Sequence, residues 1–88
     1  MFRLWGKIWK DNRLLKDSVA ESWDYSLSRT EMILQSIDKL CDEFDLGHPI
    51  WLDSNIRDFQ LHDKTRFTSD SFVESIEFDY LEIQVLEE

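Results

Sequence analysis

Four residues in the second half of the chain carry groups that can perform acid–base chemistry. Asp58 and His62 stand four residues apart, so on a helix both side chains lie on one face within reach of an ion pair. Lys64 and Arg66 follow and add two positive charges. A carboxylate that orients an imidazole, which titrates near neutral pH, is the arrangement of a general base. The alternative is a surface ion pair that holds a polar segment in place. It is favoured, because no nucleophile or glycine-rich loop accompanies these residues.

A metal site needs several convergent ligands, and the chain offers few nitrogen and sulfur donors. His48, His62 and Cys41 are the candidates. Cys41 falls on the apolar stripe of an expected helix, where an unpaired cysteine is usually a small hydrophobic residue. Aspartates are plentiful, but the alternating spacing of a calcium-binding loop is absent. We therefore expect no metal and no other cofactor.

The N-terminal segment offers a different candidate, a surface for binding a protein. Trp5, Trp9 and Leu14 lie on one face of a predicted hairpin, opposite Leu4 and Ile8. Large aromatic side chains with neighbouring bases are typical anchors of protein-binding surfaces. The three residues Trp5, Trp9 and Leu14 are therefore the candidate interaction face.

The alternative for this face is that the chain covers it. Segment 49–62, through Trp51 or Phe59, is the favoured cover, because contiguous exposed apolar patches are uncommon on small monomers. The tryptophans with their bases also suit stacking on single-stranded nucleic acid. A net charge of −9 opposes binding to a polyanion, so we expect no nucleic acid partner.

The charge along the chain is uneven. Residues 1–16 hold five bases and one acid, whereas residues 17–88 hold five bases and eighteen acids. We expect the basic opening segment to lie against acidic strands of the same molecule. The remaining acidic surface repels nucleic acid and attracts basic partners.

The composition is that of one folded domain spanning residues 1–88. Hydrophobic residues make up 42% of the chain and include twelve aromatics, enough for a core, and two glycines and one proline leave little room for linkers. A single cysteine excludes an internal disulfide. No apolar run approaches the roughly 20 residues of a membrane span, and the N-terminus lacks the features of a secretory signal. We expect a cytoplasmic protein that does not bind membranes.

The elements that must position these residues begin with the hairpin. Residues 2–10 alternate in polarity, which predicts a strand, and Asp11-Asn12 predicts a two-residue turn into a return strand over residues 13–20. With that turn Trp9 lies opposite Leu14. Lys7 then lies opposite Lys16, an unfavourable pair that Glu82 or Asp79 of a neighbouring strand would relieve.

A helix over about residues 29–45 follows. Ser28 and Glu31 have the spacing of a capping box. A stripe of apolar residues occupies one helical face, namely Ile33, Ile37, Leu40, Cys41 and Phe44. Gly47 is the expected left-handed residue after the helix, and Pro49 prevents its continuation.

The rest of the chain predicts shorter elements. Asp53 or Ser54 caps a short helix through His62, although a strand is an alternative there. A short strand is expected at 65–68, with a helical turn opened by Asp70 or Ser71. Alternation predicts a final strand over 76–86. The fold class is therefore α+β, a small antiparallel sheet of the N-terminal hairpin and the C-terminal strand packed by one main amphipathic helix, with a short second helix.

Three stretches carry a resemblance to a known family. FRLWGKIWKDNRLLKD near the start, WLDSNIRDFQLHDKTRF from Trp51 to Phe67 and FDYLEIQVLEE at the end resemble short, acidic, uncharacterised proteins of anaerobic Gram-positive bacteria. No activity, ligand or partner is known for that family, so no functional residue is transferred. The resemblance implies a free-standing protein of the bacterial cytoplasm.

Two hypotheses of function follow. The first is a non-catalytic protein-interaction module, regulatory or inhibitory, that uses the Trp5 and Trp9 face or the acidic helix and C-terminal strand. A homodimer belongs to this class, because an open sheet edge invites pairing. The second is a small enzyme or ligand-binding domain built on Asp58, His62, Lys64 and Arg66, which requires a concave pocket where they converge.

Overall fold

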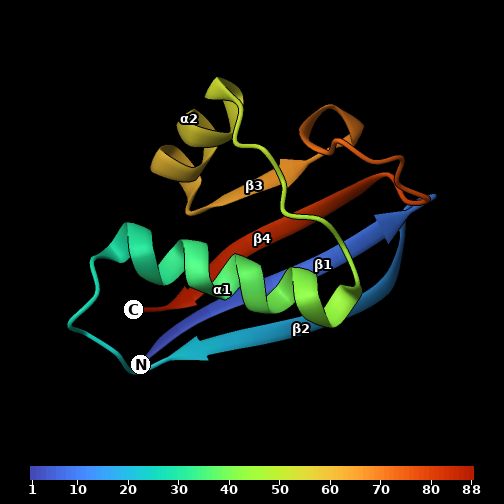
Figure 1. Cartoon of the computed structure of the whole chain (residues 1–88). Helices are drawn as coiled ribbons and strands as arrows, with labels where there is room; N and C mark the ends of the chain where they lie inside the picture. Colours follow the sequence, from blue (N-terminus) through green and yellow to red (C-terminus); the bar gives the residue numbers. More distant parts are fainter.

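Two helices lie on one face of a four-stranded antiparallel sheet in the computed structural model, which describes residues 1–88 (Figure 1). The elements in chain order are β1 (Phe2–Lys10), β2 (Arg13–Ser22), α1 (Arg29–Phe44), α2 (Asp53–His62), β3 (Lys64–Phe67), a single 3-10 turn (Ser69–Ser71) and β4 (Tyr80–Glu87). The strand order is β2-β1-β4-β3, so the first and last strands are neighbours in the centre. The predicted α+β class is confirmed.

The hairpin turn adopts the expected conformation, but the register behind it does not follow the prediction. Asp11 and Asn12 have φ angles of 52° and 62°, the left-handed pair of a turn that matches strand twist. Trp9 pairs with Leu14 as predicted. Between Ile8 and Trp9 the register then shifts, because Leu15 is an extra residue in β2.

This bulge corrects the predicted pairing of lysines. Lys7 lies opposite Asp17 rather than Lys16. Since a shift of one residue exchanges the two faces of a strand, Val19 moves beside Trp5 and Ala20 moves beside Leu4. Lys7 thus has an acid instead of a base as its cross-strand neighbour, and a small core residue lies beside Leu4.

Helix α1 begins as predicted and ends earlier than predicted. The Ser28 hydroxyl accepts a hydrogen bond from the Glu31 N–H at 3.2 Å, and the Ser28 N–H donates to the Glu31 carboxylate at 3.3 Å. The left-handed residue at the C-terminus is Asp45, with φ 57°, whereas Gly47 has no positive φ. Aspartate tolerates this conformation, and the next amide, that of Leu46, donates to the Cys41 carbonyl at 2.8 Å.

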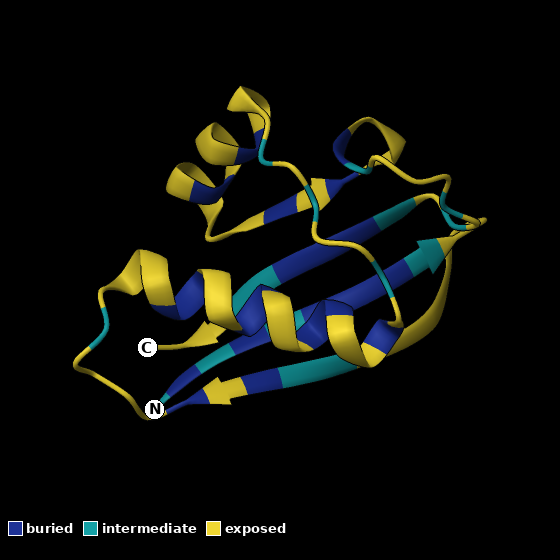
Figure 2. Ribbon diagram, viewed as in Figure 1, coloured by how far each residue is buried: buried dark blue, intermediate teal, exposed yellow.

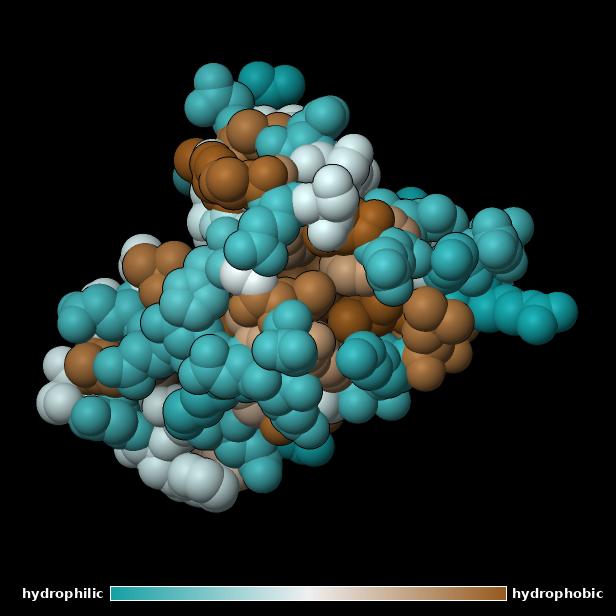
Figure 3. Space-filling model, turned by 45° about the vertical axis from the view of Figure 1, so that its right-hand side comes forward, coloured by the Kyte–Doolittle hydropathy of each residue, from teal (hydrophilic) through white to brown (hydrophobic).

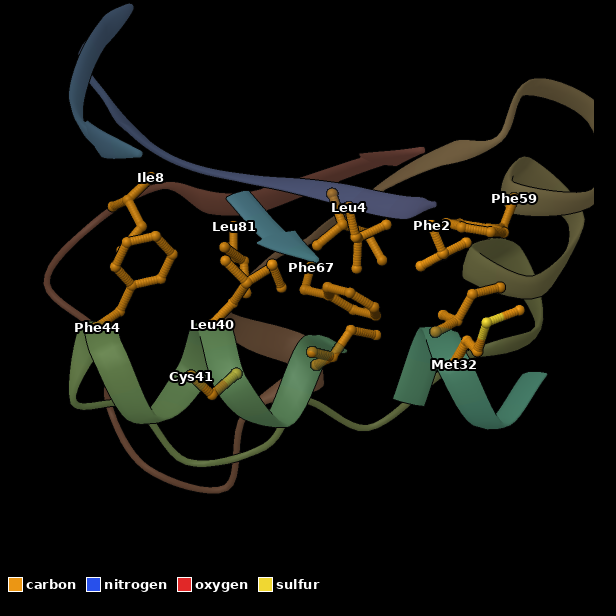
Figure 4. Packing of buried hydrophobic residues seen from close by; sticks show 14 residues of the cluster. Phe2, Leu4, Ile8, Met32, Leu40, Cys41, Phe44, Phe59, Phe67 and Leu81 are labelled. Carbon is orange, nitrogen blue, oxygen red and sulfur yellow. The ribbon is translucent and has the colours of Figure 1, made fainter. Parts of the chain in front are cut away.

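The core lies between α1 and the inward face of the sheet (Figure 4). The predicted stripe of α1 is buried and packs over Phe2, Leu4 and Ile8 of β1. Gly6 permits the close approach of helix and strand, because a Cβ there would lie 2.9 Å from Leu40 Cδ1. Figure 2 shows the result as buried segments along β1 and β4, with exposed residues on the outer face of the helices.

Segment 49–62 packs on the helical side of the sheet, so the prediction that it covers the Trp5 and Trp9 face is wrong. The Trp51 ring contacts Phe59 and Phe67 edge-on, with centroid distances of 5.5 and 5.0 Å. All three aromatics thus extend the core beneath α1.

Helix α2 forms as predicted but with a different N-cap. Leu52, not Asp53 or Ser54, is the capping position, and its N–H donates to the Asn55 side chain at 3.0 Å. The buried Asn55 amide also donates to the Thr65 hydroxyl at 3.0 Å and to the Arg66 carbonyl at 2.9 Å. Asn55 therefore fixes α2 on β3.

The shorter elements differ from the predictions at their ends. The third strand begins one residue earlier than expected, and the 3-10 turn begins at Ser69 rather than at Asp70 or Ser71. The final strand begins at Tyr80 instead of residue 76. Just before it, the Asp79 N–H donates to the Trp9 carbonyl at 2.9 Å.

Candidate functional site

The sheet face opposite the helices is not covered by either helix (Figure 1). We call it the open sheet face. It consists of Arg3, Trp5, Lys7 and Trp9 of β1, Leu14, Asp17, Val19 and Glu21 of β2, Lys64 and Arg66 of β3, and Tyr80, Glu82, Gln84 and Glu87 of β4. The predicted interaction residues Trp5, Trp9 and Leu14 all lie on it.

A chain of polar and aromatic contacts crosses all four strands of the open sheet face. On one side, the Trp5 indole N–H donates to the Asp17 carboxylate of β2 at 2.8 Å. On the other, the Lys7 ammonium lies 3.9 Å from the centroid of the Trp5 ring and forms an ion pair with Glu82 of β4 at 3.1 Å. Of the two acids predicted to approach Lys7, Glu82 and Asp79, it is Glu82 that does so.

The same contacts continue from β4 to the edge strand β3. The second carboxylate oxygen of Glu82 accepts from Arg66 Nε at 3.1 Å. The Arg66 guanidinium in turn lies over the Tyr80 ring, 4.6 Å from its centroid. The three charges that join β1, β4 and β3, those of Lys7, Glu82 and Arg66, are therefore paired, as burial of ions requires.

Glu82 is the electrostatic centre of this arrangement. Its side chain and that of Lys7 are each 9% exposed. Burial by itself raises the pKa of Glu82, but hydrogen bonds from Lys7 and Arg66 outweigh it and hold the pKa below its ordinary value. The carboxylate is thus ionised at neutral pH and holds β1, β4 and β3 together.

The two tryptophans of the face differ in one respect. The Trp5 indole N–H has a partner, whereas the Trp9 Nε1 atom is buried without one. Both rings are half-buried, and Leu14 beside Trp9 is 43% exposed. The face thus presents apolar surface beside its paired charges.

The charges of the open sheet face balance. Its four bases are Arg3, Lys7, Lys64 and Arg66, and its four acids are Asp17, Glu21, Glu82 and Glu87. The chain as a whole carries ten bases and nineteen acids, so the other six bases and fifteen acids account for its entire net charge of −9. The electrostatic field of the molecule comes from its helical side, its loops and the rest of its strands.

The four residues considered for acid–base chemistry meet at one place. Asp58 and His62 of α2 line a shallow depression of about 260 Å³ with Lys64, Thr65, Arg66 and Glu82. No ion pair joins Asp58 to His62, contrary to both interpretations of that pair. The depression contains no apolar residue and no cysteine or serine to act as a nucleophile.

A groove that the sequence did not indicate lies between α1 and α2. It has a volume of about 360 Å³ and is mainly apolar, with Ile33 and Leu34 on one side and Trp51, Ile56 and Phe59 on the other. Figure 3, turned by 45° from the view of Figure 1, shows that hydrophobic surface lies between the upper and lower parts of the molecule. No sequence pattern marked this groove, because only the structure shows that Trp51 and Phe59 pack with the core rather than on the tryptophan face.

Two further residue groups bear on chemistry. Burial, with smaller contributions from Asp38 and Asp42, raises the pKa of the Cys41 thiol to about 11, so it stays protonated in the core. No group of three or more His, Cys, Asp or Glu side chains is arranged to hold a metal ion. His48 lies elsewhere, 3.3 Å from Asp38.

Neither helix combines the length and the apolar character needed to cross a membrane. Comparison with protein-family models, with curated proteins and with solved structures finds no match to this chain.

Proposed function

We propose that this chain is a non-catalytic protein-binding module and that the open sheet face binds its partner. The observation that carries the proposal is that this face keeps Trp5, Trp9 and Leu14 at the surface, while segment 49–62, which could have covered them, packs on the opposite side of the sheet. Aromatic side chains held in place by ordered contacts are the usual anchors of protein interfaces.

The partner that fits this face carries an apolar patch bordered by bases. The charges of the face cancel, so they favour neither a strongly basic nor a strongly acidic contact surface. The net charge of −9 on the rest of the chain attracts basic groups around the contact and speeds the encounter. The same field repels nucleic acid, which favours a protein partner.

The size of the face favours a small and reversible interface. Four strands, the longest of ten residues, give a footprint of roughly 30 by 20 Å. Stable interfaces bury about 800 Å² on each partner, so a contact restricted to this footprint belongs to the smaller, transient class. Such interfaces suit a regulatory or inhibitory module of the bacterial cytoplasm, the compartment that the family resemblance implies.

The test is affinity capture from native lysate with two matched variants. Leu14→Glu adds a charge on the open sheet face, and Leu61→Glu adds the same charge on α2, where Leu61 is 69% exposed. Both leucines are exposed, so both variants are expected to fold, which circular dichroism checks.

The proposal predicts a protein that the wild type and Leu61→Glu retain and that Leu14→Glu loses. A protein that Leu14→Glu retains equally well contradicts it. Nucleic acid captured in place of protein, or a second copy of this chain as the only species bound, also contradicts the proposed partner.

A further inference from the structure

The depression beside α2 shares Lys64, Arg66 and Glu82 with the open sheet face, but it has no aromatic or apolar lining. Its walls are Asp58 and His62 of α2, Lys64, Thr65 and Arg66 of β3, and Glu82 of β4. All six side chains are polar, and they come from three elements that the chain brings to the β3 edge of the sheet. Such convergence of polar groups in a concave site is typical of recognition of a small charged group.

The two cations that line this depression keep hydrogen-bond donors that no group of the molecule accepts. Lys64 is exposed and takes part in none of the ion pairs or side-chain hydrogen bonds of the structure. Arg66 uses only Nε to bind Glu82, which leaves its two terminal nitrogens free to donate. Both Glu82 oxygens are occupied, one by Lys7 and one by Arg66.

The free nitrogens of Arg66 are also held in position. The Arg66 guanidinium is fixed between the Glu82 carboxylate and the Tyr80 ring. The backbone of the same residue is fixed through its carbonyl, which accepts from Asn55 at 2.9 Å. An arginine held in this way loses little freedom when it binds a further group, which favours affinity.

The charge count indicates the kind of ligand. Lys64 and Arg66 contribute two positive charges to the lining of the depression, and Asp58 and Glu82 contribute two negative ones. Lys7 does not line it, but its ion pair with Glu82 adds a third positive charge next to it. One positive charge is left unbalanced in a molecule whose net charge is −9. A monoanion neutralises this local excess, whereas a dianion adds a further negative charge beside Asp58.

We infer that this depression is a binding site for a carboxylate, held between the Lys64 ammonium and the terminal nitrogens of Arg66. Arginine and lysine both donate strong charge-assisted hydrogen bonds to carboxylates. The carboxylate belongs either to a small organic acid or to an acidic side chain of a protein. The inference does not rest on the proposed partner of the open sheet face, and it is tested without that partner.

The test is titration of the isotope-labelled chain, followed by amide chemical shifts at constant ionic strength with chloride as the replaced ion. Acetate represents a free acid, N-acetyl-glutamate amide represents a protein side chain, and phosphate represents a dianion. Lys64→Gln removes the free cation, and Asp58→Asn removes the free acid. Lys10→Gln, an exposed lysine near the hairpin turn, is the matched control.

The inference predicts saturable shifts at Lys64 and Arg66 with acetate or the glutamate derivative, and weaker ones with phosphate. Lys64→Gln weakens the apparent affinity by about fivefold to tenfold, Asp58→Asn strengthens it, and Lys10→Gln leaves it unchanged. A response to acetate alone favours a small organic acid as the ligand, and a response to the glutamate derivative alone favours a protein side chain.

Two results overturn the inference. One is the absence of saturable shifts with either carboxylate in a wild-type chain whose spectrum is that of a folded protein. The other is binding that is tighter for phosphate, or that Lys64→Gln and Lys10→Gln change equally. The opposite effects expected from Lys64→Gln and Asp58→Asn separate a binding role from a loss of folding, which lowers affinity in both.

Discussion

The two faces of the sheet are built from the same strands by different interactions. On the helical face, Leu4, Ile8, Leu81 and Ile83 are at most 1% exposed and pack on α1 without polar partners. On the open face, the neighbouring residues are joined by ion pairs, an indole hydrogen bond and cation–aromatic contacts. Hydrophobic burial closes the first face, whereas electrostatic pairing orders the second and leaves it accessible.

This difference explains how a small domain can keep tryptophans at its surface. The Trp5 and Tyr80 rings of the open face are each held by a charged partner beside them in the sheet, so no covering helix is needed to order them. Because the pairing depends on charge, the order of the open face depends on pH, whereas that of the helical face does not. Substitutions on the two faces should therefore differ in how much stability they remove and in how that loss changes with pH.

The largest loss of stability is expected from a substitution on the helical face. Phe67 is fully buried and its ring contacts Trp51. Phe67→Ala removes this packing and leaves a cavity, so the free energy of unfolding falls by about 4 kcal/mol. Urea denaturation measures the change at neutral pH and again at pH 4, where the loss should be similar. A loss under 1 kcal/mol would mean that the helical face does not carry the stability of the fold.

An intermediate loss of stability is expected from a substitution at the centre of the open face. Glu82→Gln removes the negative charge between Lys7 and Arg66 and leaves Lys7 buried without a counter-ion. The free energy of unfolding falls by about 2 kcal/mol at pH 7. Urea denaturation of the variant beside the wild type measures it. A loss below about 0.5 kcal/mol would show that the pairing contributes little.

The pH dependence of the same variant sharpens this test. Because the pKa of Glu82 is lower in the folded state than its ordinary value of 4.5, its stabilisation is present above about pH 4.5 and is lost as the pH falls through the folded-state pKa. The wild type therefore loses more stability than Glu82→Gln on acidification. Parallel curves of unfolding free energy against pH for the two proteins would contradict the role given to Glu82.

The smallest effect distinguishes the two tryptophans. Trp5→Phe loses the hydrogen bond to Asp17, which costs about 1 kcal/mol, whereas Trp9→Phe removes a buried N–H that has no partner. The two variants lose similar ring volume. Trp5→Phe is therefore expected to be the less stable of the two in thermal unfolding, and the reverse order would contradict the account of the open face.

The helical face could be predicted from sequence to a large extent, because it depends on patterns within single strands and helices. The alternation of residues 2–10, the capping box at Ser28 and the apolar stripe of α1 are repeating patterns that describe one element at a time. The pairing of Lys7 with Glu82 was also within reach, since basic and acidic segments that lie at opposite ends of the chain attract one another.

The open face could not be predicted in the same way, because it depends on choices between elements. The extra residue Leu15 changes which side of β2 faces Trp5, and no residue type marks that bulge in advance. Segment 49–62 carries aromatics that suit either side of the sheet. The buried bonds from Asn55 to Thr65 and Arg66 fix α2 beside β3, and they are visible only in three dimensions.

The proposed role of the open face is tested most directly by calorimetric titration of the captured partner into the wild type, Leu14→Glu and Leu61→Glu. A charge placed among the aromatic anchors should weaken binding at least about tenfold, whereas the same charge on α2 should leave the affinity unchanged. Equal affinities for Leu14→Glu and Leu61→Glu would contradict the claim that this chain binds its partner through the open sheet face.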